Sequence, residues 1–559
     1  MRRLSLILVA CGAAAALAVA ATPASGPPDV VLVTLDTLRA DRVGFLGSRR
    51  GLTPTLDRLA RQGVVFEQAL AAAPLTTVSH ATILSGMQPP GHGVRDFGMP
   101  LPSDVPWLPS LLKSRGYHTA AFVGSIVLDP KGPIAPGFDR GFDAYDAGFR
   151  ARKGGADPYQ TKERRGAEVV RRALGWLEHR PAGPLFLWVH LYDAHDPYDA
   201  PEPFRSRFAR EPYDGEVAAV DAALGSLLDG LQAAGIANEA VIAVAGDHGE
   251  SLGAHGEDTH GVFLYEETIH VPLLLRLPGD AEAGRRVGAR VGLVDLAPTL
   301  LEATGLAVPS TMQGRSLLAL ARGARLPELP AYAESEYPRR VFGWSGLASW
   351  RDERFLFVEA PRRELYDLRA DPSASRDLSA ERPAVASGMA AALAAAQRAW
   401  TRQTTAAVPS AASPELLERL ASLGYAGTGG APAAAPSGID PKDKIAVTNL
   451  LHDATLAGEE GRWREAIPLY ERVVASDPQI FTARLELGLA LARERQWARA
   501  LPHLRLVAER LPDYADARFT LGLALSSLGR RDEALRELQA ALAKDPHHAA
   551  ARQLLDRLE

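Results

Sequence analysis

Short apolar runs alternate with stretches of helical periodicity over residues 29–397 of the chain. Apolar runs of this length, bounded by turn-forming residues, are typical of buried strands. They are Val30–Leu35, His118–Val123, Leu185–His190, Ala240–Ala245, Val271–Leu277 and Ala331–Glu334. Segments of helical period, among them Ala167–Leu177 and Gly215–Ala234, lie between them. This alternation predicts an α/β fold with a central, mostly parallel sheet between layers of helices.

Polar side chains follow several of these strands directly. Ligands of α/β sheets bind beyond the carboxyl ends of the strands, so residues in these positions are the first candidates for chemistry. They are Asp36, Asp193, His195, Asp247 and His248.

The chain changes character after residue 397. We expect residues 398–441 to hold a short helix near Pro414–Leu423 and then a flexible linker, because Gly, Ala and Pro dominate the stretch 424–436. A domain boundary is therefore predicted between residues 29–397 and residues 442–559.

The last predicted domain repeats with a fixed period. Pro478, Pro512 and Pro546 are spaced by 34 residues, the period of tetratricopeptide helix pairs. Ala466, Ala500 and Ala534 keep the same step, and such small residues let paired helices approach closely. We predict an all-α domain of three repeats, at about 447–480, 481–514 and 515–548, with a capping helix after them.

The first 28 residues have the layout of a secretory signal. Arg2 and Arg3 precede an apolar run from Leu4 to Ala21, and small residues with prolines follow it. We therefore expect a signal peptide or N-terminal anchor, and a mature chain exported to the periplasm or tethered to the membrane facing outward. Cys11 follows Leu-Val-Ala in a sequence that resembles a bacterial lipoprotein box. It is either acylated there or simply one more apolar residue of the segment.

Charge and cysteine content narrow the function classes. The formal net charge is −5 and the sequence pI is about 6.3, which argues against nucleic acid as a partner, because such domains usually have a pI above about 9. Cys11 is the single cysteine of the chain, so no intrachain disulfide is expected. After the N-terminal segment, no run of the sequence is long and apolar enough to span a bilayer.

Three motifs bring together residues suited to a metal site. Asp36 ends a buried strand, Thr76 and its neighbouring hydroxyls precede a short predicted helix, and Asp247-His248 lie between glycines after another strand. His260 follows twelve residues after His248. Clustered Asp and His side chains bind divalent cations such as Zn²⁺, although each residue alone is equally compatible with a helix cap, a turn or a core histidine.

Several further motifs carry a family resemblance. Residues 29–397 resemble a sulfatase-type member of the alkaline phosphatase superfamily. The framework that carries the resemblance is Leu111–Phe122, Gly141–Asp143, Leu264–Glu267, Asp295–Thr299 and Glu364–Leu368. It implies an alkaline-phosphatase-like sandwich, and the repeats look like those appended to some bacterial sulfatase-like proteins.

The sequence departs from that family at its diagnostic positions. Sulfatases oxidise a Cys or Ser to formylglycine, but Thr76 stands there, and a secondary alcohol would oxidise to a ketone. His80 replaces the usual Arg, Thr37 the second Asp, and Gly261 the substrate-binding Lys. No formylglycine is therefore expected at this site.

The stretch around Thr76 instead resembles the superfamily's threonine-nucleophile phosphohydrolases, and the spacing to Ser85-Gly86 and His92-Gly93 is kept. This resemblance implies one metal site of Asp36, Thr76, Asp247 and His248. It implies a second site of His260 and His195, with Asp193 as a further candidate. Two Zn²⁺ ions are the first expectation, with Ca²⁺ or Mn²⁺ as alternatives. Thr76 would be the nucleophile, and Thr77 is the alternative if the register is off by one residue.

The remaining polar residues are given supporting roles. His190 and His195 are candidates to steady the substrate or its leaving group, and Ser79 and His80 to bind substrate. The acidic residues Glu250, Glu257 and Asp258 are expected to be solvated loop acids.

These residues lead to one functional expectation and two alternatives. The expectation is an exported, metal-dependent hydrolase that cleaves a phosphate or sulfate ester of a small molecule, lipid or glycan. One alternative is a phosphoryl transferase acting on a lipid or glycan, and the other is a non-catalytic scaffold. The repeats would bind a protein or peptide, or dock on the catalytic domain.

Overall fold

The computed structural model describes residues 26–147, 149, 163–401, 438–512 and 514–559. The predictions about Cys11, the N-terminal leader up to residue 25 and the helix near Pro414–Leu423 concern residues outside these ranges. None of the described helices combines the length and the apolar character needed to cross a membrane.

An eight-stranded sheet forms the centre of the first domain, with strand order β4-β3-β5-β1-β6-β7-β2-β8. The strands are β1 (Val30–Leu35), β2 (Val64–Leu70), β3 (His118–Val123), β4 (Ala144–Asp146), β5 (Leu185–Leu191), β6 (Val241–Gly246), β7 (His270–Arg276) and β8 (Arg285–Gly292). Only β7 runs antiparallel to its neighbours among them. The mostly parallel sheet predicted from the sequence is therefore confirmed.

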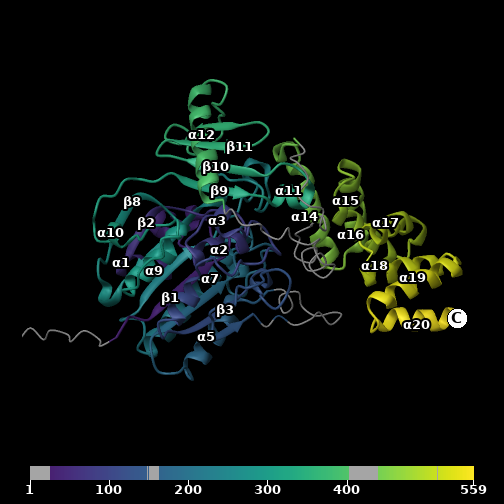
Figure 1. Cartoon of the computed structure of the whole chain (residues 1–559), viewed down its shortest axis with the longest axis horizontal. Coiled ribbons are helices and arrows are strands. Elements are labelled where there is room, and N and C mark those ends of the chain that lie inside the picture. Colours follow the sequence, from purple (N-terminus) through teal and green to yellow (C-terminus); the bar gives the residue numbers. More distant parts are fainter. Residues whose placement is uncertain (1–25, 148, 150–162, 402–437, 513) are drawn as a thin grey trace, which may run out of the picture.

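Helices cover both faces of this sheet (Figure 1). In β1, Val31 and Val33 belong to one apolar core and Val30 and Leu32 to the other, as the period of a strand requires. The described helices of this domain are α1 (Pro54–Gln62), α2 (Thr76–Ser85), α3 (Pro89–His92), α4 (Leu108–Lys113), α5 (Gly166–Leu177), α6 (Phe204–Arg207), α7 (Pro212–Ala233), α8 (Glu266–Ile269), α9 (Leu296–Ala303), α10 (Leu318–Ala321), α11 (Tyr337–Phe342) and α12 (Pro383–Trp400). The layers thus enclose two cores.

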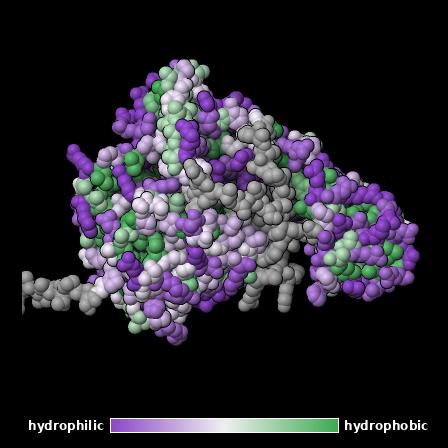
Figure 2. Space-filling view, viewed as in Figure 1, coloured by the Kyte–Doolittle hydropathy of each residue, from purple (hydrophilic) through white to green (hydrophobic). Residues whose placement is uncertain are grey.

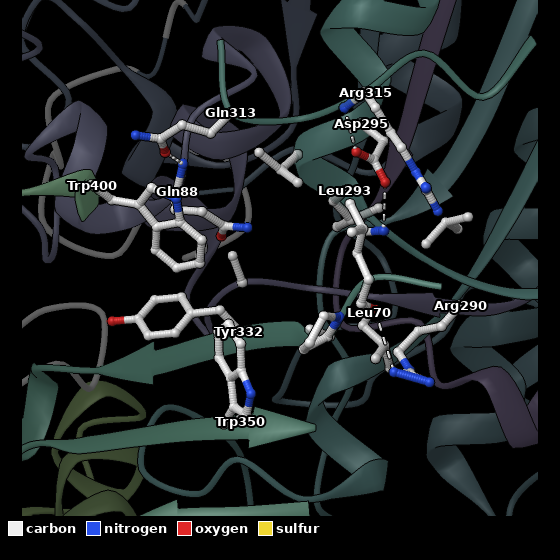
Figure 3. Close-up of a pocket in the computed structure, with 17 residues that line it drawn as sticks. Leu70, Gln88, Arg290, Leu293, Asp295, Gln313, Arg315, Tyr332, Trp350 and Trp400 are labelled. Carbon is white, nitrogen blue, oxygen red and sulfur yellow. Dashed lines mark hydrogen bonds between the residues drawn. The ribbon is translucent and has the colours of Figure 1, made fainter. Parts of the chain in front are cut away.

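A second, four-stranded antiparallel sheet lies beside the first (Figure 1). Its strands are β9 (Ala331–Ser335), β10 (Leu347–Arg351), β11 (Phe355–Glu359) and β12 (Glu364–Asp367). The predicted strand at 331–334 belongs here and not to the main sheet. A cavity of about 240 Å³ lies between the sheets, with Tyr332, Trp350 and Trp400 on one side and Leu293 on the other (Figure 3).

The repeat domain follows the predicted pattern. Its helices are α14 (Ile445–Glu459), α15 (Trp463–Ser476), α16 (Phe481–Arg493), α17 (Trp497–Arg510), α18 (Ala515–Ser527), α19 (Arg531–Lys544) and α20 (Ala549–Leu558). Gly488 and Gly522 sit where an added Cβ would lie 3.0 Å from a Leu side chain of the paired helix. Hydrophilic residues cover much of the face of this domain that Figure 2 shows, with small hydrophobic patches among them.

The backbone after β6 passes too close to a neighbouring segment for any side chain at Gly249. A Cβ there would lie 1.9 Å from the carbonyl oxygen of Glu267, in backbone that cannot swing aside. We expect Gly249→Ala to lower the free energy of unfolding by about 1–3 kcal/mol, as overpacking does. Thermal or urea unfolding of the two proteins measures the difference.

Gly175 provides the control. It lies in α5 with nothing within 4 Å of an added Cβ, so Gly175→Ala should stabilise the helix by about 0.5–1 kcal/mol. Equal stability of the Gly249→Ala variant and the wild type would contradict the close approach.

Candidate metal centre and active site

The ends of neighbouring strands bring the first site residues together. Leu35 at the end of β1 is in register with Gly246 at the end of β6, so the next residues, Asp36 and Asp247, lie side by side. His190 in β5 is in register with Thr34 of β1. The helix α2 begins at Thr76 and faces the same edge of the sheet. The strand order therefore gathers these residues at the carboxyl ends of the strands, where their positions in the sequence predict them.

Thr76 lies within a compact group of ligand atoms. Its Oγ1 is 3.4 Å from each carboxylate oxygen of Asp36 and 3.2 Å from Nε2 of His248. One ligand atom each from Asp36, Asp247 and His248 lies within 4.8 Å of the others. All four side chains are fully buried. The first predicted metal site is thus assembled as one cluster.

A second group of ligand atoms shares Asp247 and adds His80 and His190. Neither ring nitrogen of His190 has a hydrogen bond within the described residues, although Nε2 lies 3.2 Å from an oxygen of Asp36. Burial lowers the pKa of His190 to about 4 and that of His80 to about 3, so both rings are neutral. A neutral imidazole is the form that binds metals.

The two buried carboxylates of the cluster, Asp36 and Asp247, are suited to binding a divalent cation. Burial raises the pKa of Asp36 to about 7, although His248 and the hydrogen bond from Thr76 lower it. Burial and the charge of Asp36 also raise the pKa of Asp247, whose Oδ2 has no hydrogen bond. Within the described residues, neither carboxylate pairs with a Lys or Arg. A bound cation would supply the missing positive charge.

His248 is the exception among the buried histidines. Burial by itself lowers the pKa of His248, but the adjacent carboxylates of Asp247 and Asp36 outweigh it and raise the pKa. Its Nδ1 lies 3.0 Å from the carbonyl oxygen of Gly249, which leaves Nε2 directed at the cluster. A second contact of this kind commonly orients a metal-ligating histidine.

The predicted second site is only partly brought together. The ring centroid of His260 is 4.7 Å from that of His248 and 4.9 Å from that of His195. Asp193 is turned elsewhere, because its Oδ2 accepts a hydrogen bond of 2.7 Å from Gly166 N at the start of α5. The metal roles of Asp193, His195 and His260 stay predictions.

Two acidic residues are not the solvated loop acids that we expected. Glu250 and Glu257 are 0% and 1% exposed. An oxygen of Glu250 lies 3.0 Å from His260 Nδ1, and Glu257 accepts hydrogen bonds from Ser251 and from the backbone of Val262. The sequence hides this because the glycine-rich loop 249–261 folds back over the site. The one sequence feature that could have placed Glu250 near the site is its position directly after Asp247-His248-Gly249.

The hydroxyls of α2 differ in direction. Thr77 Oγ1 donates to the carbonyl of Val127 at 2.6 Å, whereas Thr76 Oγ1 contacts Asp36 and His248. Ser79 Oγ donates to the carbonyl of Asp247 at 2.6 Å. His80 lies 2.9 Å from Thr34 and 2.7 Å from the carbonyl of Thr76 through its two ring nitrogens. Ser79 and His80 therefore support the cluster internally, and their predicted contact with substrate stays a prediction.

Comparison with known families agrees with this architecture. The model of the Sulfatase family matches residues 28–306, and that of "N-sulphoglucosamine sulphohydrolase, C-terminal" matches residues 256–397. Tetratricopeptide repeat models match residues 453–515 and 491–558.

Individual relatives are distant. The chain is 28% identical over 414 residues to steryl-sulfatase of Mus musculus, an alignment covering 54% of the chain and 66% of that protein. It is 26% identical over 328 residues to the ulvan-active sulfatase of Formosa agariphila, covering 52% and 64% respectively. The chain thus spans slightly less than two thirds of either protein.

Among solved structures, the phosphonate monoester hydrolase of Agrobacterium radiobacter has the same fold. The TM-score is 0.57 at 24% sequence identity, and the alignment covers 68% of this chain and 97% of that one.

The raised pKa of Asp36 predicts how cation binding depends on pH. Without a cation, the folded chain keeps a proton on Asp36 up to about pH 7, whereas the unfolded chain loses it near its ordinary value of 3.8. The stability of the metal-free protein therefore falls as the pH rises through this window. We expect the melting temperatures of Zn²⁺- or Mn²⁺-loaded and chelator-treated protein to diverge by about 4 °C or more between about pH 5 and pH 8.

The Asp36→Asn variant is the matched control. It cannot titrate at this position, so the divergence should shrink strongly in it. A difference in melting temperature that is independent of pH in the wild type would refute the assignment of Asp36 as a ligand.

Proposed function

Because residues 28–397 form a domain of the sulfatase family, we propose that this chain hydrolyses phosphate or sulfate esters with Thr76 as the nucleophile and a divalent cation as cofactor. The observation that carries the proposal is the position of Thr76 Oγ1, 3.4 Å from Asp36 and 3.2 Å from His248 at the start of α2. Asp36, Thr76, Asp247 and His248 would hold the cation.

The proposed nucleophile is the residue at the position where sulfatases have a Cys or Ser, which is Thr76 in this chain. The only cysteine is Cys11, far from the cluster in sequence, and a threonine cannot become formylglycine. Thr76 must therefore act through its own hydroxyl. A cation bound here would lower the pKa of that hydroxyl and offset the negative charge that develops during the reaction.

The surrounding residues supply the remaining chemistry. His248 Nε2 and the Asp36 oxygens are the acceptors within reach of the Thr76 proton. The first N–H groups of α2 have no partners inside the helix, and together with the positive end of its dipole they favour the oxygens of an anionic ester.

The reaction then proceeds in two displacements. The Thr76 oxygen forms a bond to phosphorus or sulfur as the bond to the alcohol breaks, and the alcohol leaves with a proton. Water then attacks the threonine ester and releases inorganic phosphate or sulfate, which restores the hydroxyl. His190 and His195 are proposed to steady the substrate or leaving group.

The proposal extends to the place of action. The leader-like sequence of residues 1–28 supports export to the periplasm or outward-facing attachment to the membrane. A small-molecule, lipid or glycan ester in that compartment is the proposed class of substrate.

Substitution at Thr76 tests the nucleophile. We expect Thr76→Ala to lower kcat/KM for an aryl phosphate or aryl sulfate by about 10³-fold or more, because Thr76 Oγ1 is the hydroxyl that contacts both Asp36 and His248. Thr76→Ser should retain a substantial fraction of the activity. Thr77→Ala is the matched control, because Thr77 Oγ1 binds Val127, and it should change the rate by less than about tenfold.

The covalent step can be observed separately. Mass spectrometry of acid-quenched reactions should find a phosphate or sulfate ester on the peptide containing Thr76, and its identity tells the two substrates apart. Transfer of the group to an added lipid or glycan alcohol would instead support a transferase. Full activity of Thr76→Ala, or the absence of turnover and metal in the wild type, would overturn the proposal, the latter in favour of a scaffold.

A further inference from the structure

The first repeat helix, α14, reaches the rim of the catalytic cluster. His452 Nε2 lies 3.0 Å from a carboxylate oxygen of Asp196, the residue after His195. One turn earlier, Asn449 Nδ2 donates to the carbonyl of Gly256 at 2.8 Å, and its Oδ1 accepts from Asp258 N at 3.2 Å. Residues three apart share one helix face, so this face of α14 contacts both loops that carry His195 and His260.

Other contacts hold α14 in this place. Lys442 lies 2.7 Å from Glu364 of β12, and the Trp344 indole donates to Asp477 at 2.9 Å. A single apolar cluster includes Trp344 of the catalytic domain and Leu451 of α14. We expected the repeats either to bind a protein or peptide or to dock on the catalytic domain. In the structure they are docked on the catalytic domain.

Asp196 connects the repeat helix to His195. Its carboxylate contacts His452, and its backbone carbonyl accepts a hydrogen bond from Nδ1 of His195. The ring of His195 also stacks on Tyr192, with centroids 4.4 Å apart, and meets His260 edge-on. A hydrogen bond at Nδ1 sets which nitrogen of a neutral imidazole carries the proton, and so leaves Nε2 as the acceptor.

We propose that His452 is a positioning residue of the active site: it holds Asp196, which in turn fixes the orientation and tautomer of His195. The repeat domain is then a wall of the catalytic site supplied by a separate part of the chain. This inference rests on the proposed function, because the role of His195 toward the substrate belongs to it.

Kinetics of the full-length protein test the positioning role. We expect His452→Ala to lower kcat on an aryl phosphate or sulfate by about tenfold, the size seen when an outer partner of a functional histidine is removed. KM and the bound metal should change by less than about twofold. His452→Gln keeps a side-chain donor and should recover most of the rate. His503→Gln in α17 is the matched control and should leave both constants unchanged.

A double-variant comparison tests the same contact through kcat and through the melting temperature, and the melting temperature needs no activity. If His452 acts through Asp196, then Asp196→Ala, His452→Ala and the double variant should show similar kcat values. Their effects on the melting temperature should also fail to add, because both single variants break the same contact. Additive effects in both measurements, or an unchanged kcat in His452→Ala, would overturn the inference.

The two proposals fail in different ways. A wild-type protein that turns over no ester but shows the non-additive melting temperatures would remove the proposed function and the positioning role while keeping the contact. Active protein with additive variants would remove the positioning role alone.

Discussion

The burial of two carboxylates at adjacent strand ends is the constraint on which the site depends. Asp36 and Asp247 are fully buried, and their nearest ionisable neighbours are histidines. Burying an ionised carboxylate costs several kcal/mol unless an opposite charge accompanies it. Without a cation, Asp36 keeps a proton up to about pH 7, and hydrophobic packing around β1 and β6 must offset the cost of burial that remains. The ligand cluster accordingly lies at the ends of β1 and β6, the two central strands of the sheet, and not on an edge strand.

Prediction from sequence succeeded where a short stretch of chain determines position. Asp36, Asp247 and His248 directly follow buried strands, and parallel strands end at a common edge. Thr76 is the first residue of its helix, so a short local pattern was enough to locate it. The repeats were found because their period recurs in every unit, and the structure has three helix pairs and a capping helix.

The sequence was less informative where the position of a residue depends on the path of a loop or on strand pairing. Asp193 follows a strand as the other candidates do, but no sequence pattern indicated that its Oδ2 binds the start of α5. Glu250 and Glu257 have ordinary loop sequences, yet the loop that holds them folds inward. Strand β8, with sequence RRVGARVG, was missed because an edge strand with one polar face lacks a continuous apolar run. The contacts of Asp193 and β8 involve residues distant in sequence, whereas those of Glu250 and Glu257 lie 5 to 10 residues away within one folded loop.

The docked repeat helix α14 is a further example of a contact between segments distant in sequence, and this one lies next to the proposed active site. The candidate ligands come from one domain, whereas α14 contacts the loops around them. Changes on α14 can therefore alter how His195 is held without disturbing Asp36, Thr76 or His248. A site built in this way separates its two requirements: the sheet provides the reactive cluster, and a separate helical module controls the geometry at its rim.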